Sequence, residues 1–115
     1  MKNHRSVVLM MLVLMSVGVA LSQAPLPPTN LTLQPGMHGG VMLRWDSSAN
    51  ALGYKVFKAV DTSNFFRVAV VLRPGYFDWA IFPNQTYHYY VKASNLSGDS
   101  SPSDTVSYTL GPPPP

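Results

Sequence analysis

The side chains that could act as bases in an enzyme are few in this 115-residue chain. A nucleophilic enzyme needs Ser or Cys beside a His that an acidic group orients. After residue 22 the chain offers only His38 and His88, and neither lies in a nucleophile elbow or a His-x-x-His ligand pair. We therefore expect both to be exposed structural histidines and the chain to be non-catalytic.

Acidic and glycine-rich motifs predict no other chemistry. Glycosidases need two carboxyls on facing walls of a cleft, whereas the acidic residues here are five scattered aspartates. Asp78 precedes Trp79 in a predicted strand, and we expect it to bond neighbouring backbone or side chains. No glycine pattern leads into a helix, so no phosphate site is predicted. The absence of Cys excludes disulfides and thiolate metal sites, and we expect no cofactor.

Residues 1–22 have the pattern of a secretory signal peptide. Lys2 and Arg5 precede an apolar run at 7–21, which is shorter than the roughly 20 residues that span a bilayer. Small residues surround a cleavage position after Ser22, so we expect the mature chain to begin at Gln23. The prediction is a secreted, extracellular protein (periplasmic if bacterial) with no membrane span after cleavage.

The charge of the mature chain argues against a nucleic-acid partner. Removing Lys2 and Arg5 from the eight Lys plus Arg leaves six cations against five aspartates. A polyanion-binding protein needs a basic stripe that remains after processing. We therefore expect no nucleic acid among the partners.

Short runs of alternating apolar and polar residues fill the rest of the chain. They lie at 31–33, 41–45, 54–60, 65–72, 76–82, 87–93 and 106–110, separated by Pro, Gly, Asn and Asp. In the second run Val41, Leu43 and Trp45 share one face. The pattern predicts seven strands in an all-β antiparallel sandwich, with a domain at 23–110 and a proline-rich tail at 111–115.

The order of these residues resembles the fibronectin type III domain, an immunoglobulin-like sandwich. The opening PPTNLTL is similar to that family's first strand, and Trp45 stands where its second strand carries a core tryptophan. The segment 81–104, IFPNQTYHYYVKASNLSGDSSPSD, is similar to the family's L-x-P-x-x-x-Y corner followed by a strand and a Ser-rich loop.

The resemblance implies a core and a tyrosine corner. Tyr87 would place its ring in the core and bond its hydroxyl to the backbone of the preceding loop. The structural core expected from the pattern comprises Trp45, Tyr54, Val56, Ile81, Pro83, Tyr87, Tyr89 and Val91. The loop at 97–99 reads Ser-Gly-Asp, without the arginine of integrin-binding members, and the cysteines and Trp-Ser-x-Trp-Ser box of cytokine receptors are missing.

The third and sixth strands are neighbours in this fold, which predicts a contact surface. Lys55 and Phe57 should lie beside His88, Tyr90 and Lys92 on the outward face. Aromatic rings flanked by lysines are typical of a protein contact, although Phe57 and Tyr90 could equally be a cross-strand pair that stabilises the sheet.

A loop provides the second candidate surface. Residues 95–103 are small and polar, with Asp99 and Ser100 as candidate contacts. The first functional hypothesis is an extracellular module that binds or spaces proteins, as in adhesion. The alternative is an accessory module of a polysaccharide-processing system, in which aromatic faces stack on sugars; Trp45 is expected in the core, and Trp79 fits either hypothesis.

Three Asn-x-Ser/Thr triplets make Asn30, Asn84 and Asn95 candidate glycosylation acceptors in a eukaryotic secretory pathway. A turn role already accounts for Asn84, and the family pattern accounts for Asn95. The tail at 111–115 is expected to be a stiff polyproline II linker rather than a ligand for an aromatic groove.

Overall fold

The computed structural model describes residues 23–113 and 115, so the predicted signal peptide lies outside the described residues. The described chain contains eight strands: β1 (Thr29–Pro35), β2 (Val41–Asp46), β3 (Gly53–Val60), β4 (Phe66–Val71), β5 (Gly75–Asp78), β6 (Thr86–Asn95), β7 (Gly98–Asp99) and β8 (Val106–Thr109). Within these residues there is no helix with the length and apolarity to cross a membrane.

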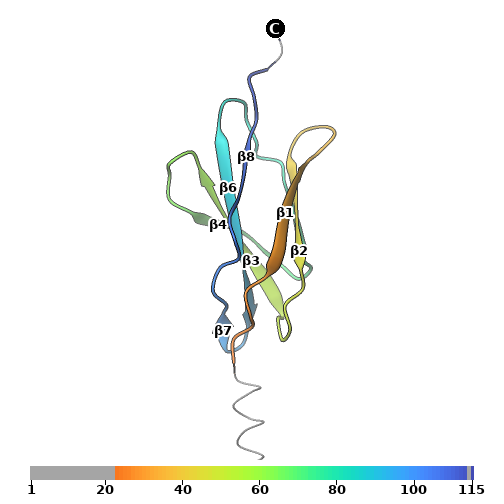
Figure 1. The fold of residues 1–115 in the computed structure, drawn as a ribbon, viewed down its shortest axis with the longest axis vertical. Coiled ribbons are helices and arrows are strands. Elements are labelled where there is room, and N and C mark those ends of the chain that lie inside the picture. The colour runs from red at the N-terminus through yellow and green to blue at the C-terminus, as the bar shows by residue number, and fades with distance from the viewer. Residues whose placement is uncertain (1–22, 114) are drawn as a thin grey trace, which may run out of the picture.

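The strands form two antiparallel sheets that pack face to face (Figure 1). One sheet has the order β1-β2-β5. The other has the order β4-β3-β6-β7, and β8 pairs with β6 on the same side as β7. The predicted all-β antiparallel sandwich is therefore confirmed, with the two-residue β7 as an additional strand.

The core forms because side chains alternate across each strand. Along β6 the odd-numbered positions from Tyr87 to Ala93 are buried and the even-numbered ones are half-buried. The core consists of Val41, Leu43, Trp45, Tyr54, Val56, Tyr87, Tyr89, Val91 and Ala93. Six of the eight predicted core residues lie in this cluster.

The other two predicted core residues lie after β5, where the structure differs from the prediction. The fifth strand ends at Asp78 instead of continuing to Phe82. Asp78 turns inward and accepts the N–H of Ala80, which replaces the strand pattern with a turn. Ile81 is consequently only half-buried against the core, and Pro83 is exposed on the loop before β6.

Two serines hold the segment between β7 and β8 against β6. The hydroxyl of Ser100 accepts the N–H of Ala93, and the hydroxyl of Ser103 accepts the N–H of Val91. The N–H groups of both serines donate to the carbonyls of the same two β6 residues. These bonds satisfy buried backbone groups where no regular strand pairs with β6.

Candidate functional site

The outward face of β3 and β6 brings the predicted sheet residues together. Lys55 lies opposite Lys92, and Phe57 lies opposite Tyr90. Directly opposite residues of an antiparallel pair point to the same face. His88, opposite Ala59, is on this face as well, and its Nδ1 lies 2.6 Å from Ser107 Oγ of β8. The β3–β6 surface, as it is called below, consists of Lys55, Phe57, His88, Tyr90 and Lys92.

Three aromatic rings form the centre of this surface. The rings of Phe57 and Tyr90 stack with centroids 4.8 Å apart and 12° between their planes. Phe65, just before β4, places its ring 4.7 Å from Tyr90 at a tilt of 58° and is 40% exposed. The stack is thus partly open to solvent and offers apolar area to a partner.

The ammonium groups of Lys55 and Lys92 contact different neighbours. Like charges directly opposite each other in a sheet are unfavourable. Lys55 Nζ forms an ion pair with Asp99 Oδ1 at 2.9 Å, and Lys92 Nζ lies 5.5 Å from the centroid of Phe57. The hydrogen bond from Lys55, followed by one from Ser94, lowers the pKa of Asp99. Asp99 therefore belongs to the same surface as the lysines.

The edge strand β4 extends the surface with residues that the sequence reasoning missed. Arg67 is opposite Phe57 and Val70 is opposite Lys55, so both share their face. Val70 is 61% exposed. In the described part of the chain neither Arg67 nor Lys92 forms an ion pair. Strict alternation along 65–72 would put Arg67 and Val70 on opposite faces, because they are three positions apart. The register shift between Val56 and Phe57 in the pairing of β3 with β4 brings both to the outward face.

Ser100 does not belong to a binding surface, contrary to the prediction. Its side chain is buried, with 6% exposure, and its hydroxyl is bonded to β6. Two positions after Gly98 the chain has already turned back against the sheet. From the predicted loop surface, Asp99 therefore joins the β3–β6 surface through Lys55, whereas Ser100 is excluded from it.

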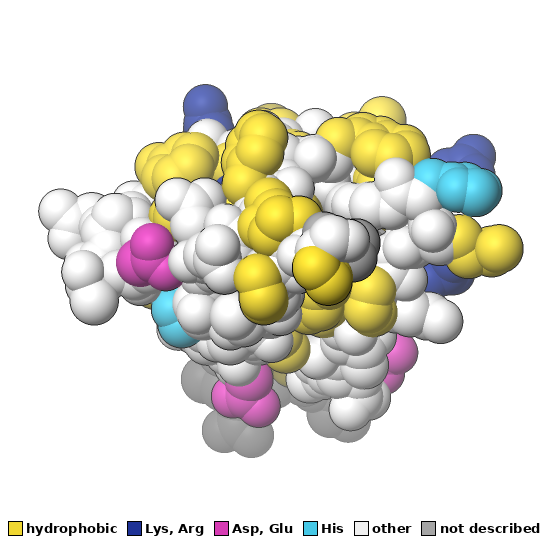
Figure 2. Space-filling model, turned by 90° about the horizontal axis from the view of Figure 1, so that it is seen from above, with side chains coloured by type: hydrophobic (Ala, Val, Ile, Leu, Met, Phe, Trp, Pro, Cys, Tyr) yellow, Lys and Arg dark blue, Asp and Glu magenta, His cyan; other side chains and the backbone are white. Residues whose placement is uncertain are grey.

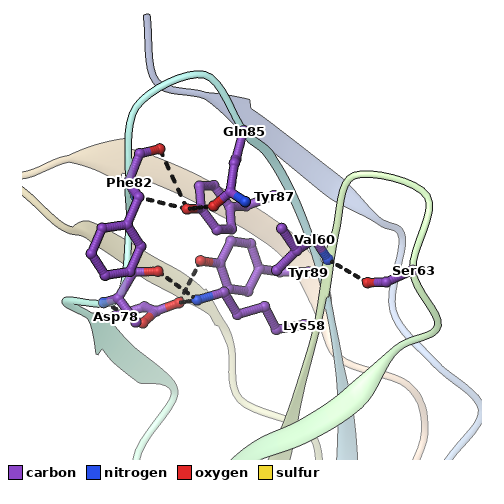
Figure 3. Close-up of polar contacts among 9 residues, drawn as sticks. Lys58, Val60, Ser63, Asp78, Phe82, Gln85, Tyr87 and Tyr89 are labelled. Atoms are coloured by element: carbon purple, nitrogen blue, oxygen red, sulfur yellow. Dashed lines mark hydrogen bonds and ion pairs between the residues drawn. The ribbon is translucent and has the colours of Figure 1, made fainter. Parts of the chain in front are cut away.

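A buried ion pair joins the two sheets, and the sequence reasoning did not find it (Figure 3). Lys58 of β3 places Nζ 2.7 Å from Asp78 Oδ2 at the end of β5. The same ammonium donates to the carbonyl of Ala80 at 2.8 Å, and Tyr89 donates to Asp78 Oδ2 at 2.5 Å. Both charged side chains are almost excluded from solvent, at 5% and 6% exposure.

The hydrogen bonds decide the ionisation of this cluster. Burial by itself would raise the pKa of Asp78, but bonds from Lys58, Tyr89 and the Ala80 N–H hold that pKa below its ordinary value. Burial and the bond to Asp78 raise the pKa of Tyr89. Asp78 is therefore a carboxylate and Tyr89 a neutral phenol at neutral pH. Both carboxylate oxygens of Asp78 accept hydrogen bonds from other groups of the fold, so the cluster has a structural role.

The tyrosine corner lies beside the ion pair. Tyr87 is 1% exposed, and its hydroxyl accepts the N–H of Phe82 at 2.7 Å. The hydroxyl donates to Gln85 Oε1 at 2.9 Å, and Lys58 Nζ lies 4.8 Å from the ring centroid. The corner thus fixes the loop that leads from Asp78 into β6.

A second pair of aromatic rings, one exposed and one half-buried, lies at the end of the other sheet. Trp79 is 68% exposed and its ring is 4.5 Å from that of Phe77. Phe77 covers Gly40, where φ is +72° and an added Cβ would lie 2.4 Å from the ring. Seen from the end that carries the C-terminal tail, the molecule exposes hydrophobic side chains in several groups (Figure 2).

The described residues contain no cluster of three or more His, Asp or Glu side chains that could hold a metal ion. His38 is exposed in the turn between β1 and β2, and His88 is half-buried on the β3–β6 surface. The prediction of no catalytic histidine stays a prediction. Among the residues that the structure describes, the only ion pair in the interior is the one between Asp78 and Lys58.

Comparisons with known proteins agree with the fold. No protein-family model matches the sequence, and no curated protein sequence does. Solved structures do match. An Fn3-like protein from Clostridium thermocellum is 21% identical with a TM-score of 0.67, covering 81% of this chain and 99% of that one. The fibronectin type III domain of human fibronectin type III domain containing protein 3 is 23% identical with a TM-score of 0.65, covering 79% and 90%.

Domains A168–A170 of titin also match, with 24% identity and a TM-score of 0.68 over 78% of this chain. This chain spans only 33% of that structure, which is a fragment of several domains. The chain accordingly has the fibronectin type III fold predicted from its sequence.

Proposed function

We propose that this chain is an exported, non-catalytic protein-binding module that uses the β3–β6 surface together with Phe65, Arg67 and Asp99. The observation that carries the proposal is the half-open stack of Phe57 and Tyr90, flanked by cations on both sides. Contact surfaces are enriched in aromatic residues and Arg.

The charges favour a partner that presents carboxylates around an apolar side chain. Lys55 is already neutralised by Asp99, whereas Lys92 and Arg67 lie beside the rings. A complementary acidic surface would pair with these two cations and cover the aromatic stack. Electrostatic complementarity mainly sets the association rate and its dependence on salt.

The experiment is a binding screen of the mature chain against purified extracellular proteins from its source, followed by variants. Phe57→Ser with Tyr90→Ser should lower affinity about tenfold or more, because central aromatic contacts carry most binding energy. Arg67→Glu with Lys92→Glu should slow association. Trp79→Ser is the matched control, since Trp79 is an exposed aromatic residue directly after β5 of the other sheet. Loss of affinity in the control alone would overturn the proposed surface.

The aromatic stack has a second explanation that the same variants address. Stacked aromatic pairs contribute about 0.5–1.5 kcal/mol to stability beyond their buried area. Unfolding curves of the Phe57→Ser, Tyr90→Ser variant separate lost stability from lost contact. A variant that remains folded at the assay temperature and still binds normally would leave the rings with a purely structural role.

A polysaccharide-associated role is the alternative, and the exposure of Trp79 favours it. An indole 68% exposed beside Phe77 is a surface on which a sugar ring could stack. Affinity electrophoresis in soluble polysaccharides tests this role. Retardation that Trp79→Ser removes, and that the Phe57 and Tyr90 changes leave intact, would support the alternative over protein binding.

Export rests on the pattern of residues 1–22. We expect secretion of the full chain to yield a protein that begins at Gln23 or within two residues of it. N-terminal sequencing of the exported protein is the measurement, and recovery of intact Met1 in a membrane fraction would contradict export with cleavage.

A further inference from the structure

We infer that Asn84 is the N-glycosylation acceptor of this chain, and that Asn30 and Asn95 use their amide groups to stabilise the fold instead. The inference rests on the export proposed above, because the modification belongs to a eukaryotic secretory pathway. All three residues stand in Asn-x-Ser/Thr triplets, so the sequence alone does not separate them. Their side-chain environments do.

The chemistry takes place at the side-chain nitrogen. A lipid-linked oligosaccharide diphosphate donates the sugar: the bond between Asn Nδ2 and the anomeric carbon forms, and the bond from that carbon to the diphosphate oxygen breaks. The lipid diphosphate departs, and Nδ2 loses one proton. The modified amide keeps a single N–H, so an Asn that donates two hydrogen bonds through Nδ2 must give up one of them.

Asn95 makes this double use of its amide. Nδ2 donates to the carbonyl of Gln23 at 2.9 Å and to that of Asn50 at 3.2 Å, which ties the N-terminal segment and the β2–β3 loop to the end of β6. Its Oδ1 accepts the N–H of Ser97 at 2.8 Å, and Ser97 is the hydroxyl residue of the same triplet. A glycan on Asn95 would therefore remove one of these two connections.

Asn30 is engaged as well, although less completely. Its Nδ2 donates to Asp46 Oδ2 at 2.6 Å, across the pair of β1 and β2. This is a charge-assisted bond at the position where the register of the two strands shifts. A glycan at Nδ2 would lie against the carboxylate of Asp46 and compete with that bond.

Asn84 differs from both in its side-chain hydrogen bonds, although Asn30 is exposed as well. Asn84 is exposed on the loop between β5 and β6, and its backbone N–H donates to the carbonyl of Leu110 at 2.9 Å. Among the described residues, the side-chain hydrogen bonds of this loop involve Phe82, Gln85, Thr86 and Tyr87, and none involves the side chain of Asn84. The loop lies at the same end as the C-terminal tail, opposite β7 (Figure 1). A glycan there would leave the Lys92 and Asp99 end of the β3–β6 surface uncovered.

The conformation of Asn84 provides a matched variant. Its φ is +65°, a region that Gly and Asn adopt with little strain. Asn84→Gly therefore removes the acceptor and keeps the turn. The turn alone could account for an Asn at this position, so the test must detect the sugar directly.

The experiment is secretion of the full chain from a eukaryotic cell, once with its own leader and once with an established secretory leader. Trypsin cleavage at Arg44, Arg67 and Lys92 places the three triplets on separate peptides. An N-glycan amidase converts each glycosylated Asn to Asp, which peptide masses detect. We expect conversion at Asn84 and its loss in Asn84→Gly, with Asn30 and Asn95 mainly unmodified. Exported protein with unmodified Asn84, or with its glycan mainly on Asn30 or Asn95, would overturn the inference.

The two leaders separate this inference from the proposed export. Export with the established leader but not with the chain's own leader would contradict the proposed signal peptide and still allow the acceptor to be read. Bacterially produced, unglycosylated protein supplies the second measurement. Asn95→Asp should lower the urea midpoint of unfolding there, because Asp lacks the two Nδ2 donors, whereas Asn84→Gly should leave it nearly unchanged. An unchanged midpoint for Asn95→Asp would contradict the structural role of Asn95.

Discussion

Lys58 Nζ lies 2.7 Å from Asp78 Oδ2, and this buried ion pair connects the centre of one sheet to the edge strand of the other. The carboxylate also receives bonds from Tyr89 and from the N–H of Ala80. A buried charge pair is tolerated when further hydrogen bonds satisfy its remaining groups. The pair ends β5 at Asp78 and directs the following loop toward the tyrosine corner.

Asp78→Asn should destabilise the protein by about 3–5 kcal/mol, because it leaves the ammonium of Lys58 buried without a counter-charge. The double variant Asp78→Asn, Lys58→Met should recover most of that loss, since it removes both charges and keeps an acceptor for Tyr89. Urea unfolding of the wild type, both single variants and the double variant gives the coupling free energy. A double variant as unstable as the sum of its singles would contradict the ion pair.

The ion pair also predicts a dependence on pH. The pKa of Asp78 is lowered in the folded chain from its ordinary 3.8, so near that pH the unfolded chain binds more protons than the folded one. The stability from this group is complete above the ordinary value and is lost as the pH falls through the lower folded value.

Stability curves at about pH 5, 3 and 2 should show this loss. The wild type should lose more free energy of unfolding on acidification than the variant Asp78→Asn, Lys58→Met, which retains every other aspartate. Parallel losses in the two proteins would show that Asp78 does not titrate with a lowered pKa.

The core makes a third prediction. Trp45 is 5% exposed and its ring lies 5.4 Å from Tyr54 in an edge contact, so Trp45→Ala should cost about 3–5 kcal/mol. Tyr87→Phe keeps the ring and leaves the N–H of Phe82 without its partner, which should cost about 1–3 kcal/mol. Denaturant midpoints measure both, and an unchanged midpoint for Trp45→Ala would be incompatible with its buried position.

The serines that replace strand pairing make a fourth prediction. Ser103→Ala removes the acceptor of the Val91 N–H, which is buried, and should cost about 1–3 kcal/mol. Ser101, exposed in the same segment, is the control, and Ser101→Ala should change stability by less than about 0.5 kcal/mol. Amide hydrogen exchange gives an independent reading, because the Val91 amide should exchange faster in Ser103→Ala only. Equal effects of the two changes would argue against the bond.

The sequence determined the sandwich because alternation of side chains depends only on neighbours along the chain. Val41, Leu43 and Trp45 had to share a face, and Tyr87 through Ala93 had to alternate between core and surface. The same local periodicity placed Lys55 and Phe57 outward. Pairing the third and sixth strands then followed from the resemblance, and the register puts Phe57 opposite Tyr90.

Local patterns could not show which polar groups turn inward. Lys58 is a charged residue at an inward-facing position of β3, and only the approach of Asp78 from the other sheet makes its burial favourable. Asp78 in turn ended a strand that periodicity continued to Phe82. Pro83 became exposed for the same reason, because the chain leaves the sheet after Asp78 instead of running along it.

The tertiary structure also decided how similar residues differ in role. Ser100 and Ser101 are neighbours of the same type, yet only Ser100 meets an unpaired N–H of β6. Asn30, Asn84 and Asn95 share one motif, and partners far along the chain at Asp46, Gln23 and Asn50 distinguish them. Periodicity reports the face on which a residue lies. The groups that meet it there are fixed only when the two sheets pack.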